Sequence, residues 1–161
     1  MFNLVEILDK EIKAYSNLKE LFEEKKESLI HAKADDLGAL DNNILSLNDK
    51  IKRLNNSRRK IALEIVGDEE ANMSTLIAFA EEGFPDFAEK LKERKVKICK
   101  LFSELALLNN QNVELLKHGI IISNKMLETF INAFAPQGSF YNGAGKTDTH
   151  DIDMWTINEE I

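Results

Sequence analysis

Several residue types that mark a chemical function or a covalent framework are scarce in this chain. Its 161 residues include one cysteine, three histidines, two prolines and seven glycines. The single cysteine, Cys99, excludes an internal disulfide framework, and we expect it to be a small buried packing residue in a reducing compartment. The histidines lie far apart, and none has a second ligand at helical spacing, so no metal site is predicted.

Long uncharged stretches and clusters of cations are also missing. No apolar run is long enough to span a bilayer, and Glu6, Asp9 and Glu11 interrupt the first apolar stretch, so we expect neither a signal peptide nor membrane insertion. The formal net charge of −7 argues against nucleic-acid binding. No nucleophile lies with a base and an orienting group, so we expect no enzymatic activity and no cofactor. These absences favour a cytoplasmic protein.

The sequence does contain three stretches in which apolar residues recur at alternating steps of three and four. This spacing predicts helices with one buried face. The first stripe consists of Leu4, Leu8, Ile12, Tyr15, Leu18, Phe22 and Leu29. The second consists of Leu37, Leu40, Ile44, Leu47, Ile51, Leu54, Ile61 and Ile65. The third consists of Phe87, Leu91, Ile98, Leu101, Leu105, Leu108, Leu115, Ile122 and Met126.

Polar residues, glycines and a proline predict the helix ends. The predicted N-caps are Asn3 with Glu6 completing a capping box, Asp35 or Asp36, and Ser74. Gly67 and Gly83 are predicted to follow the ends of two helices, because glycine adopts the left-handed conformation that closes a helix. Pro85 or Asp86 is predicted to lie in the first turn of the last helix.

Together these signals predict an all-α chain. We expect an antiparallel three-helix up-down bundle or coiled coil of helices at about 3–32, 36–66 and 84–135, with a short connecting helix at about 74–82. Residues 1–135 would form one domain, and the acidic, glycine-containing residues 136–161 a flexible C-terminal tail. At about 1.5 Å per residue, the last helix would be roughly 75 Å long if unbroken, about 30 Å longer than each of the others. Whether it bends at Gly119 is open.

Arg94 interrupts the third apolar stripe, and two other polar residues in the stripes, Arg58 and Asn112, are more informative. Arg58 replaces an aliphatic residue in the second stripe. It could pair with a carboxylate on a neighbouring helix, but we favour an interpretation in which its stem packs and its head reaches water. Asn112 falls at a core position, with Asn109 beside it, and a buried Asn determines which partner and register are allowed. We expect the packed part of the long helix to end near Leu108.

Beyond Gly119 the last helix carries more apolar residues than one stripe needs. They are Ile120, Ile121, Ile122, Met126, Leu127, Phe130, Ile131 and Phe134. A helix that is apolar on several sides is either enclosed by its own chain or has a partner. The alternatives are an enclosed end, a homodimer contact, and a docking surface for an amphipathic helix of another protein.

The order of several motifs resembles the FlgN family of flagellar type III export chaperones. Residues 5–9 fit the family's first helix, and residues 108–116 match its L-N-x-x-N-x-x-L-L pattern, with Asn124 at the usual spacing. Residues 140–145 are similar to its Tyr-Gly-Ala-Asp-Gly tail signature. They depart from it at Asn142, Gly143 and Ala144. The resemblance covers nearly the whole chain.

This resemblance implies a cytoplasmic chaperone that binds terminal helical segments of hook-associated (hook-filament junction) proteins and delivers them to the export gate. The family binds substrate with its C-terminal part. The candidate substrate-binding residues are therefore Leu115, Leu116, Gly119, Ile122, Met126, Phe130 and Phe134. The family-motif residues that would determine register are Asn109, Asn112 and Asn124. The family's tail tyrosine, associated with docking at the export gate, corresponds to Tyr141.

Two further hypotheses concern the same apolar face. The tail residues Ile152, Trp155 and Ile157 could cover it when no substrate is bound, although a tail without any specific contact is as well supported. The alternative to a chaperone is a structural coiled-coil adaptor that self-associates through this face, and a weak homodimer is compatible with both functions.

Overall fold

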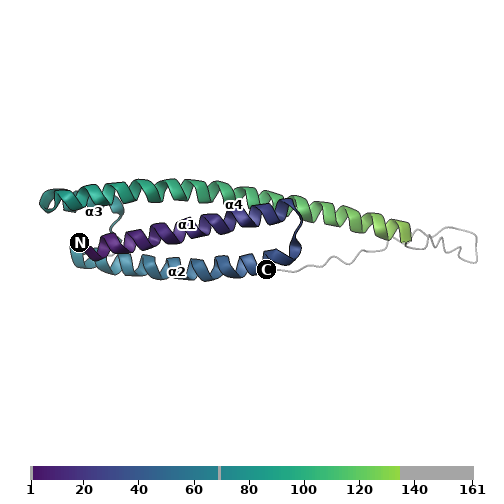
Figure 1. Ribbon diagram of the computed structural model, residues 1–161, viewed down its shortest axis with the longest axis horizontal. Helices are drawn as coiled ribbons and strands as arrows, with labels where there is room; N and C mark the ends of the chain where they lie inside the picture. Colours follow the sequence, from purple (N-terminus) through teal and green to yellow (C-terminus); the bar gives the residue numbers. More distant parts are fainter. Residues whose placement is uncertain (1, 69, 135–161) are drawn as a thin grey trace, which may run out of the picture. The chain divides into compact units, whose positions relative to one another are not determined.

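The computed structural model describes residues 2–68 and 70–134, and side chains at residues 3–68 and 70–131 (Figure 1). Within this part the chain is helical and contains no strand, which confirms the all-α prediction. The helices are α1 (Phe2–Ile30), α2 (Ala34–Val66), α3 (Met73–Gly83) and α4 (Pro85–Phe134). Each bound lies within two residues of its predicted position, because the apolar period of a helix is a local signal.

The predicted N-caps are wrong in all three helices for which one was named. Asn3 lies inside α1, which extends beyond it to Phe2. Asp35 and Asp36 lie in the first turn of α2, where their negative charges interact favourably with the positive end of the helix dipole. The N-cap of α2 is Lys33, whose side chain makes no capping hydrogen bond. In α3 the cap is Asn72, whose Oδ1 accepts the backbone N–H groups of residues 74 and 75 at 2.8 and 3.0 Å.

The predicted helix ends and the proline start agree better with the structure. Gly67 follows α2 with φ of 75°, and its N–H donates to the carbonyl of Leu63 at 2.9 Å. Only glycine adopts this left-handed conformation without a steric penalty, so this prediction is confirmed. Gly83 was predicted to follow α3, but it is the last residue of that helix and Phe84 is the C-cap. Pro85 is the first residue of α4, where its missing N–H costs nothing.

The chain divides into two units, residues 1–120 and residues 121–161, and α4 contributes to both. In the first unit α1 and α2 are antiparallel neighbours (Figure 1). Two ion pairs show the direction, since Glu11 near the start of α1 meets Arg58 near the end of α2. Lys25, near the end of α1, meets Asp41 near the start of α2. A connection of three residues between the helices enforces this geometry.

The first-unit part of α4 runs parallel to α1. Three contacts join residues that are 85 positions apart, and this constant offset is possible only if both helices run in the same direction in register. They are Asp9 with Arg94, Lys19 with Glu104, and Lys26 with Gln111. The guanidinium of Arg94 binds both carboxylate oxygens of Asp9 at 2.8 and 2.9 Å, so this polar residue of the apolar stripe faces an acid on α1.

Two apolar clusters form the core of the first unit. The first contains Leu4, Leu8, Ala62, Ala71, Leu76, Ile77, Ala80, Ala88 and Leu91. The second contains Ala14, Tyr15, Leu18, Ile44, Ile51 and Leu105. Because α3 supplies three residues to the first cluster, it covers the beginning of α4. The second cluster depends on α1, α2 and α4 alone.

The buried part of α4 extends further toward the C-terminus than the sequence predicted. Asn112 is buried, Leu115 is half-buried, and residues 116–131 are all exposed. The expected end near Leu108 is therefore short by about two helical turns. The reason is that α1 extends beside α4 as far as Phe22 and Lys26, which contact the 111–112 region. The helical assignment of α4 continues without a break through Gly119.

Candidate protein-docking surface

The second unit begins with a helical stretch that exposes large apolar side chains. We call residues 121–131 the C-terminal apolar segment. Its exposed apolar residues are Ile121, Ile122, Met126, Leu127, Phe130 and Ile131. Ile122 and Phe130 are 58% and 57% exposed. Six large apolar side chains in eleven residues are many for a surface helix, so this segment is the main candidate for binding another protein.

The predicted substrate-binding residues differ in exposure. Ile122, Met126 and Phe130 are exposed in the C-terminal apolar segment. In the first unit, Leu116 and Gly119 are exposed, whereas Leu115 is only half-buried and offers less surface. A Cβ added at Gly119 would meet no atom within 4 Å, so this glycine is not required for close packing. The side chain of Phe134 lies outside the described residues.

A second exposed stripe on α4 was missed in the sequence. Within the first unit it consists of Phe102, Ala106, Asn109, Val113, Leu116 and Ile120. We call these six residues the outer seam. Their spacing alternates strictly between four and three. The first five each follow a buried or half-buried residue of α4, and these residues form the packed stripe: Leu101, Leu105, Leu108, Asn112 and Leu115. One residue turns a helix by about 100°, so the outer seam lies beside the packed stripe on the helix surface. Testing every heptad register of the sequence would have found it.

The three asparagines of the family motif occupy different environments. Asn112 is 4% exposed, and its Nδ2 donates to the backbone carbonyl of Phe22 at 3.0 Å. Its Oδ1 has no hydrogen-bond partner within the described part of the chain. Asn109 and Asn124 are exposed. Asn112 alone is therefore placed to hold α4 in register against α1, and its unpaired oxygen costs stability there.

The interpretation of Arg58 as a side chain with its guanidinium in solvent is wrong. Its Nε donates to Oε1 of Glu11 at 3.0 Å, and the Glu11 side chain is only 3% exposed. Burial raises the pKa of Glu11, and the charge and hydrogen bond of Arg58 partly oppose that rise. The guanidinium also donates to Oδ1 of Asn55 at 3.2 Å. The residue therefore pairs a buried carboxylate between α1 and α2, which is a structural role.

The prediction that Cys99 is a buried packing residue is also wrong, because its side chain is exposed. It follows the half-buried Ile98, and one step along the helix turns the side chain about 100° away from the packed stripe. It lines a shallow cavity of about 520 Å³ with residues of α3, among them Ser74 and Ile77. The described residues contain no group of three or more His, Cys, Asp or Glu side chains that could hold a metal ion.

Four candidate residues lie wholly outside the described part of the chain. They are Tyr141, Ile152, Trp155 and Ile157. Their proposed contacts with the export gate and with the apolar face therefore stay predictions. Among the helices that are described, none is both long enough and apolar enough to cross a membrane.

Comparison with known proteins gives one match. A family model described as FlgN protein matches residues 1–149. This range contains all four helices and residues 140–145, the tail stretch that is similar to the family signature. No match was found among curated proteins or among solved structures.

Proposed function

The chain belongs to the FlgN protein family, a family of flagellar export chaperones, and on that premise we propose which proteins it binds and where. Its substrates are hook-associated (hook-filament junction) proteins, whose terminal helical segments bind the C-terminal apolar segment. Binding shields surfaces that would otherwise assemble before export. The single observation that supports this proposal best is the exposure of six large apolar side chains in the C-terminal apolar segment.

The charges of this surface indicate how it binds. Residues 113–131 contain two acids and two bases, so 2 − 2 = 0, although the whole chain carries −7. Two of the four, Glu114 and Lys117, pair with each other at 2.9 Å. A partner helix bound to the C-terminal apolar segment would bury roughly 600 Å² per partner, at the low end of specific association. Apolar burial would therefore drive binding, and the affinity would depend little on salt.

The remaining parts of the chain have supporting roles in this proposal. Residues 1–135 act as one helical domain, in which α1, α2 and α4 form a three-helix up-down bundle that presents the end of α4. The acidic tail, residues 136–161, carries Tyr141, which docks at the export gate and so delivers the substrate. Before substrate binds, Ile152, Trp155 and Ile157 cover the apolar face. The protein works in the cytoplasm, without a cofactor and without enzymatic activity.

Binding to a purified hook-associated protein tests the substrate assignment. We expect Ile122→Ser combined with Phe130→Ser to weaken binding by about 100-fold, since each removes a large apolar contact. Both side chains are exposed, so the fold should persist. Leu45→Ser combined with Val96→Ser is the matched control, because these exposed apolar residues lie outside the surface. Equal affinities of the two double variants would contradict the proposed site.

The alternative is self-association as a structural coiled-coil adaptor. The strict heptad spacing of the outer seam, with Asn109 at one position, is the observation that favours it, since paired Asn residues are tolerated in parallel dimers. Mass measurement in solution discriminates between the two. A stable dimer that Ile122→Ser and Phe130→Ser dissociate, and that binds no hook-associated protein, would support the adaptor.

A further inference from the structure

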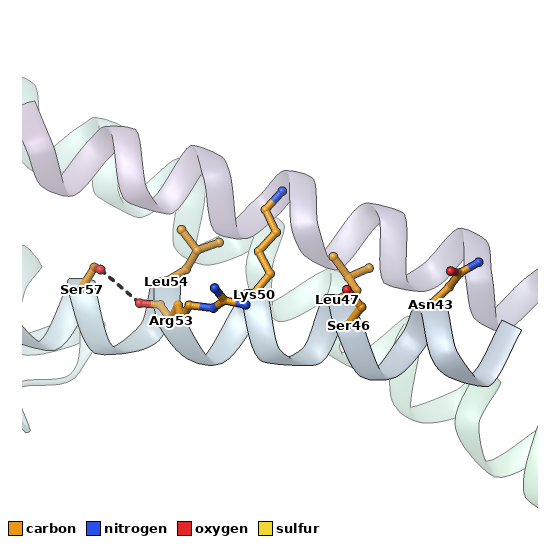
Figure 2. Close-up of a pocket in the computed structure, with 7 residues that line it drawn as sticks. All are labelled: Asn43, Ser46, Leu47, Lys50, Arg53, Leu54 and Ser57. Atoms are coloured by element: carbon orange, nitrogen blue, oxygen red, sulfur yellow. Dashed lines mark hydrogen bonds between the residues drawn. The ribbon is translucent and has the colours of Figure 1, made fainter. Parts of the chain in front are cut away.

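A groove runs along α2, and every residue that lines it belongs to that helix. Figure 2 shows its lining side chains on successive turns, from Asn43 to Ser57. The groove is open and has a volume of about 460 Å³. At about 1.5 Å per residue it extends over roughly 20 Å of helix, which is the length of a short helical segment rather than of a small ligand. It involves none of the residues of the C-terminal apolar segment or the outer seam.

Two leucines form the apolar part of the groove. Leu47 and Leu54 are half-buried, and both pack against the second core cluster. They lie seven residues apart, with Lys50 between them on the same side of α2 (Figure 2). A spacing of seven residues is the repeat by which one helix packs against another. The exposed edges of these leucines therefore match the apolar stripe of an added helix.

The charged residues of the groove are both cations. Lys50 and Arg53 are exposed, and neither has a carboxylate partner among the described residues. The Arg53 side chain donates from Nε to the backbone carbonyl of Asp49 at 3.3 Å, and the Arg53 carbonyl accepts from the Ser57 hydroxyl at 3.1 Å. The neighbouring cations are neutralised, Lys52 by Asp49 and Arg59 by Glu70. No acidic residue lines the groove, although the whole chain is acidic.

We propose that this groove binds an acidic amphipathic helix of a partner protein. Its apolar residues, spaced by three and four, pack on Leu47 and Leu54, and its flanking carboxylates pair with Lys50 and Arg53. The uncharged polar groups of Asn43 and Ser46 line the rest of the groove and can form hydrogen bonds with the partner helix, whereas the Ser57 hydroxyl already donates to the Arg53 carbonyl. Two cations are too few to recognise an anionic membrane or a nucleic acid, both of which need a larger cluster.

The site differs from the substrate surface in chemistry as well as position. Binding at the C-terminal apolar segment depends on apolar burial, whereas binding at the α2 groove depends partly on exposed charges and weakens with salt. The chain therefore has one set of residues for a substrate helix and a separate set for an acidic partner helix. The proposal does not rest on the identity of the export substrate.

The test uses the full-length chain and a synthetic, fluorescently labelled amphipathic peptide of about fourteen residues, with leucines at helical spacing and flanking glutamates. Fluorescence anisotropy measures its affinity at low and high salt. We expect Lys50→Glu combined with Arg53→Glu to weaken binding at least about ten-fold. Lys50→Gln combined with Arg53→Gln should give a smaller loss, because it removes the attraction without adding repulsion.

Three controls make the result decisive. Lys13→Glu combined with Lys97→Glu makes the same change in net charge at exposed lysines of α1 and α4 that do not line the groove, and should leave the affinity nearly unchanged. A peptide with lysines in place of its glutamates should not bind. Ile122→Ser with Phe130→Ser should not affect this peptide. The proposal is overturned if the wild-type chain shows no salt-sensitive binding, or if the two glutamate double variants bind equally.

Discussion

The buried ion pair between α1 and α2 allows a quantitative prediction about stability. Replacing Arg58 with Met keeps a long apolar stem but removes the cation that pairs with Glu11, whose side chain is 3% exposed. A buried carboxylate that loses its partner must stay charged at a high cost or take up a proton. The second route limits the cost. From an ordinary pKa of 4.5, protonation at pH 7 costs roughly 3.4 kcal/mol, at about 1.36 kcal/mol per pH unit.

This limit makes the effect of Arg58→Met depend on pH. We expect the variant to lose about 3 kcal/mol of unfolding free energy at pH 7, a large part of what holds a domain of this size together. At pH 5 the same protonation costs only about 0.7 kcal/mol, so most of the loss should disappear. Denaturant unfolding followed by far-ultraviolet circular dichroism measures both values, because the described residues are almost entirely helical.

The sign of the effect follows from the direction of the pKa shift. Burial raises the pKa of Glu11 in the folded protein above its unfolded value, so folding favours the protonated carboxyl. The resulting stability is fully present below the unfolded pKa, and it is lost as the pH rises through the folded pKa. The charge and hydrogen bond of Arg58 lower the folded-state pKa of Glu11. Removing Arg58 should therefore raise this pKa, so that the loss of stability continues to higher pH. Glu11→Gln should abolish this pH dependence with or without Arg58.

Arg53→Met is the matched control for Arg58→Met. Arg53 lies on the same helix and is exposed, and its contact is with a backbone carbonyl, so we expect a change within about 0.5 kcal/mol at both pH values. The reasoning is refuted if Arg58→Met loses the same free energy at pH 5 and pH 7. It is also refuted if Glu11→Gln does not relieve the loss in the double variant.

Three further predictions concern other parts of the chain. Asn112→Leu should raise the unfolding free energy by about 1 kcal/mol, because it removes a buried unpaired oxygen, and a loss of stability in urea unfolding would contradict this. Gly67→Ala should lower the melting temperature through a cost of about 1 kcal/mol at a φ of 75°, whereas Gly119→Ala, in open space inside α4, should raise it. Deleting residues 148–161 should increase affinity for a hook-associated protein if the tail covers the apolar face, and unchanged affinity in the same assay would exclude that role.

The candidate docking surface could be predicted only in part from the spacing of apolar residues. The excess of apolar residues after Gly119 was visible in the sequence, and it correctly marked a stretch that the described chain leaves exposed. The outer seam was not predicted, because its polar Asn109 and small Ala106 make its apolar signal weaker than that of the stripe beside it. The match of the family model supports the flagellar interpretation of the motifs, while the binding roles of individual residues stay predictions.

Local chemistry was enough to predict the four helices, their ends near Gly67 and Pro85, and the lack of strands in the described residues, since each depends on neighbours a few positions away. Only the tertiary structure decided which polar residues are paired and where burial ends. Arg58 meets Glu11 because α2 runs antiparallel to α1, and α4 stays covered to Asn112 because α1 extends beside it that far. An apolar stripe in the sequence shows which face of a helix can be buried. That face is buried only along the part of the helix that another helix packs against.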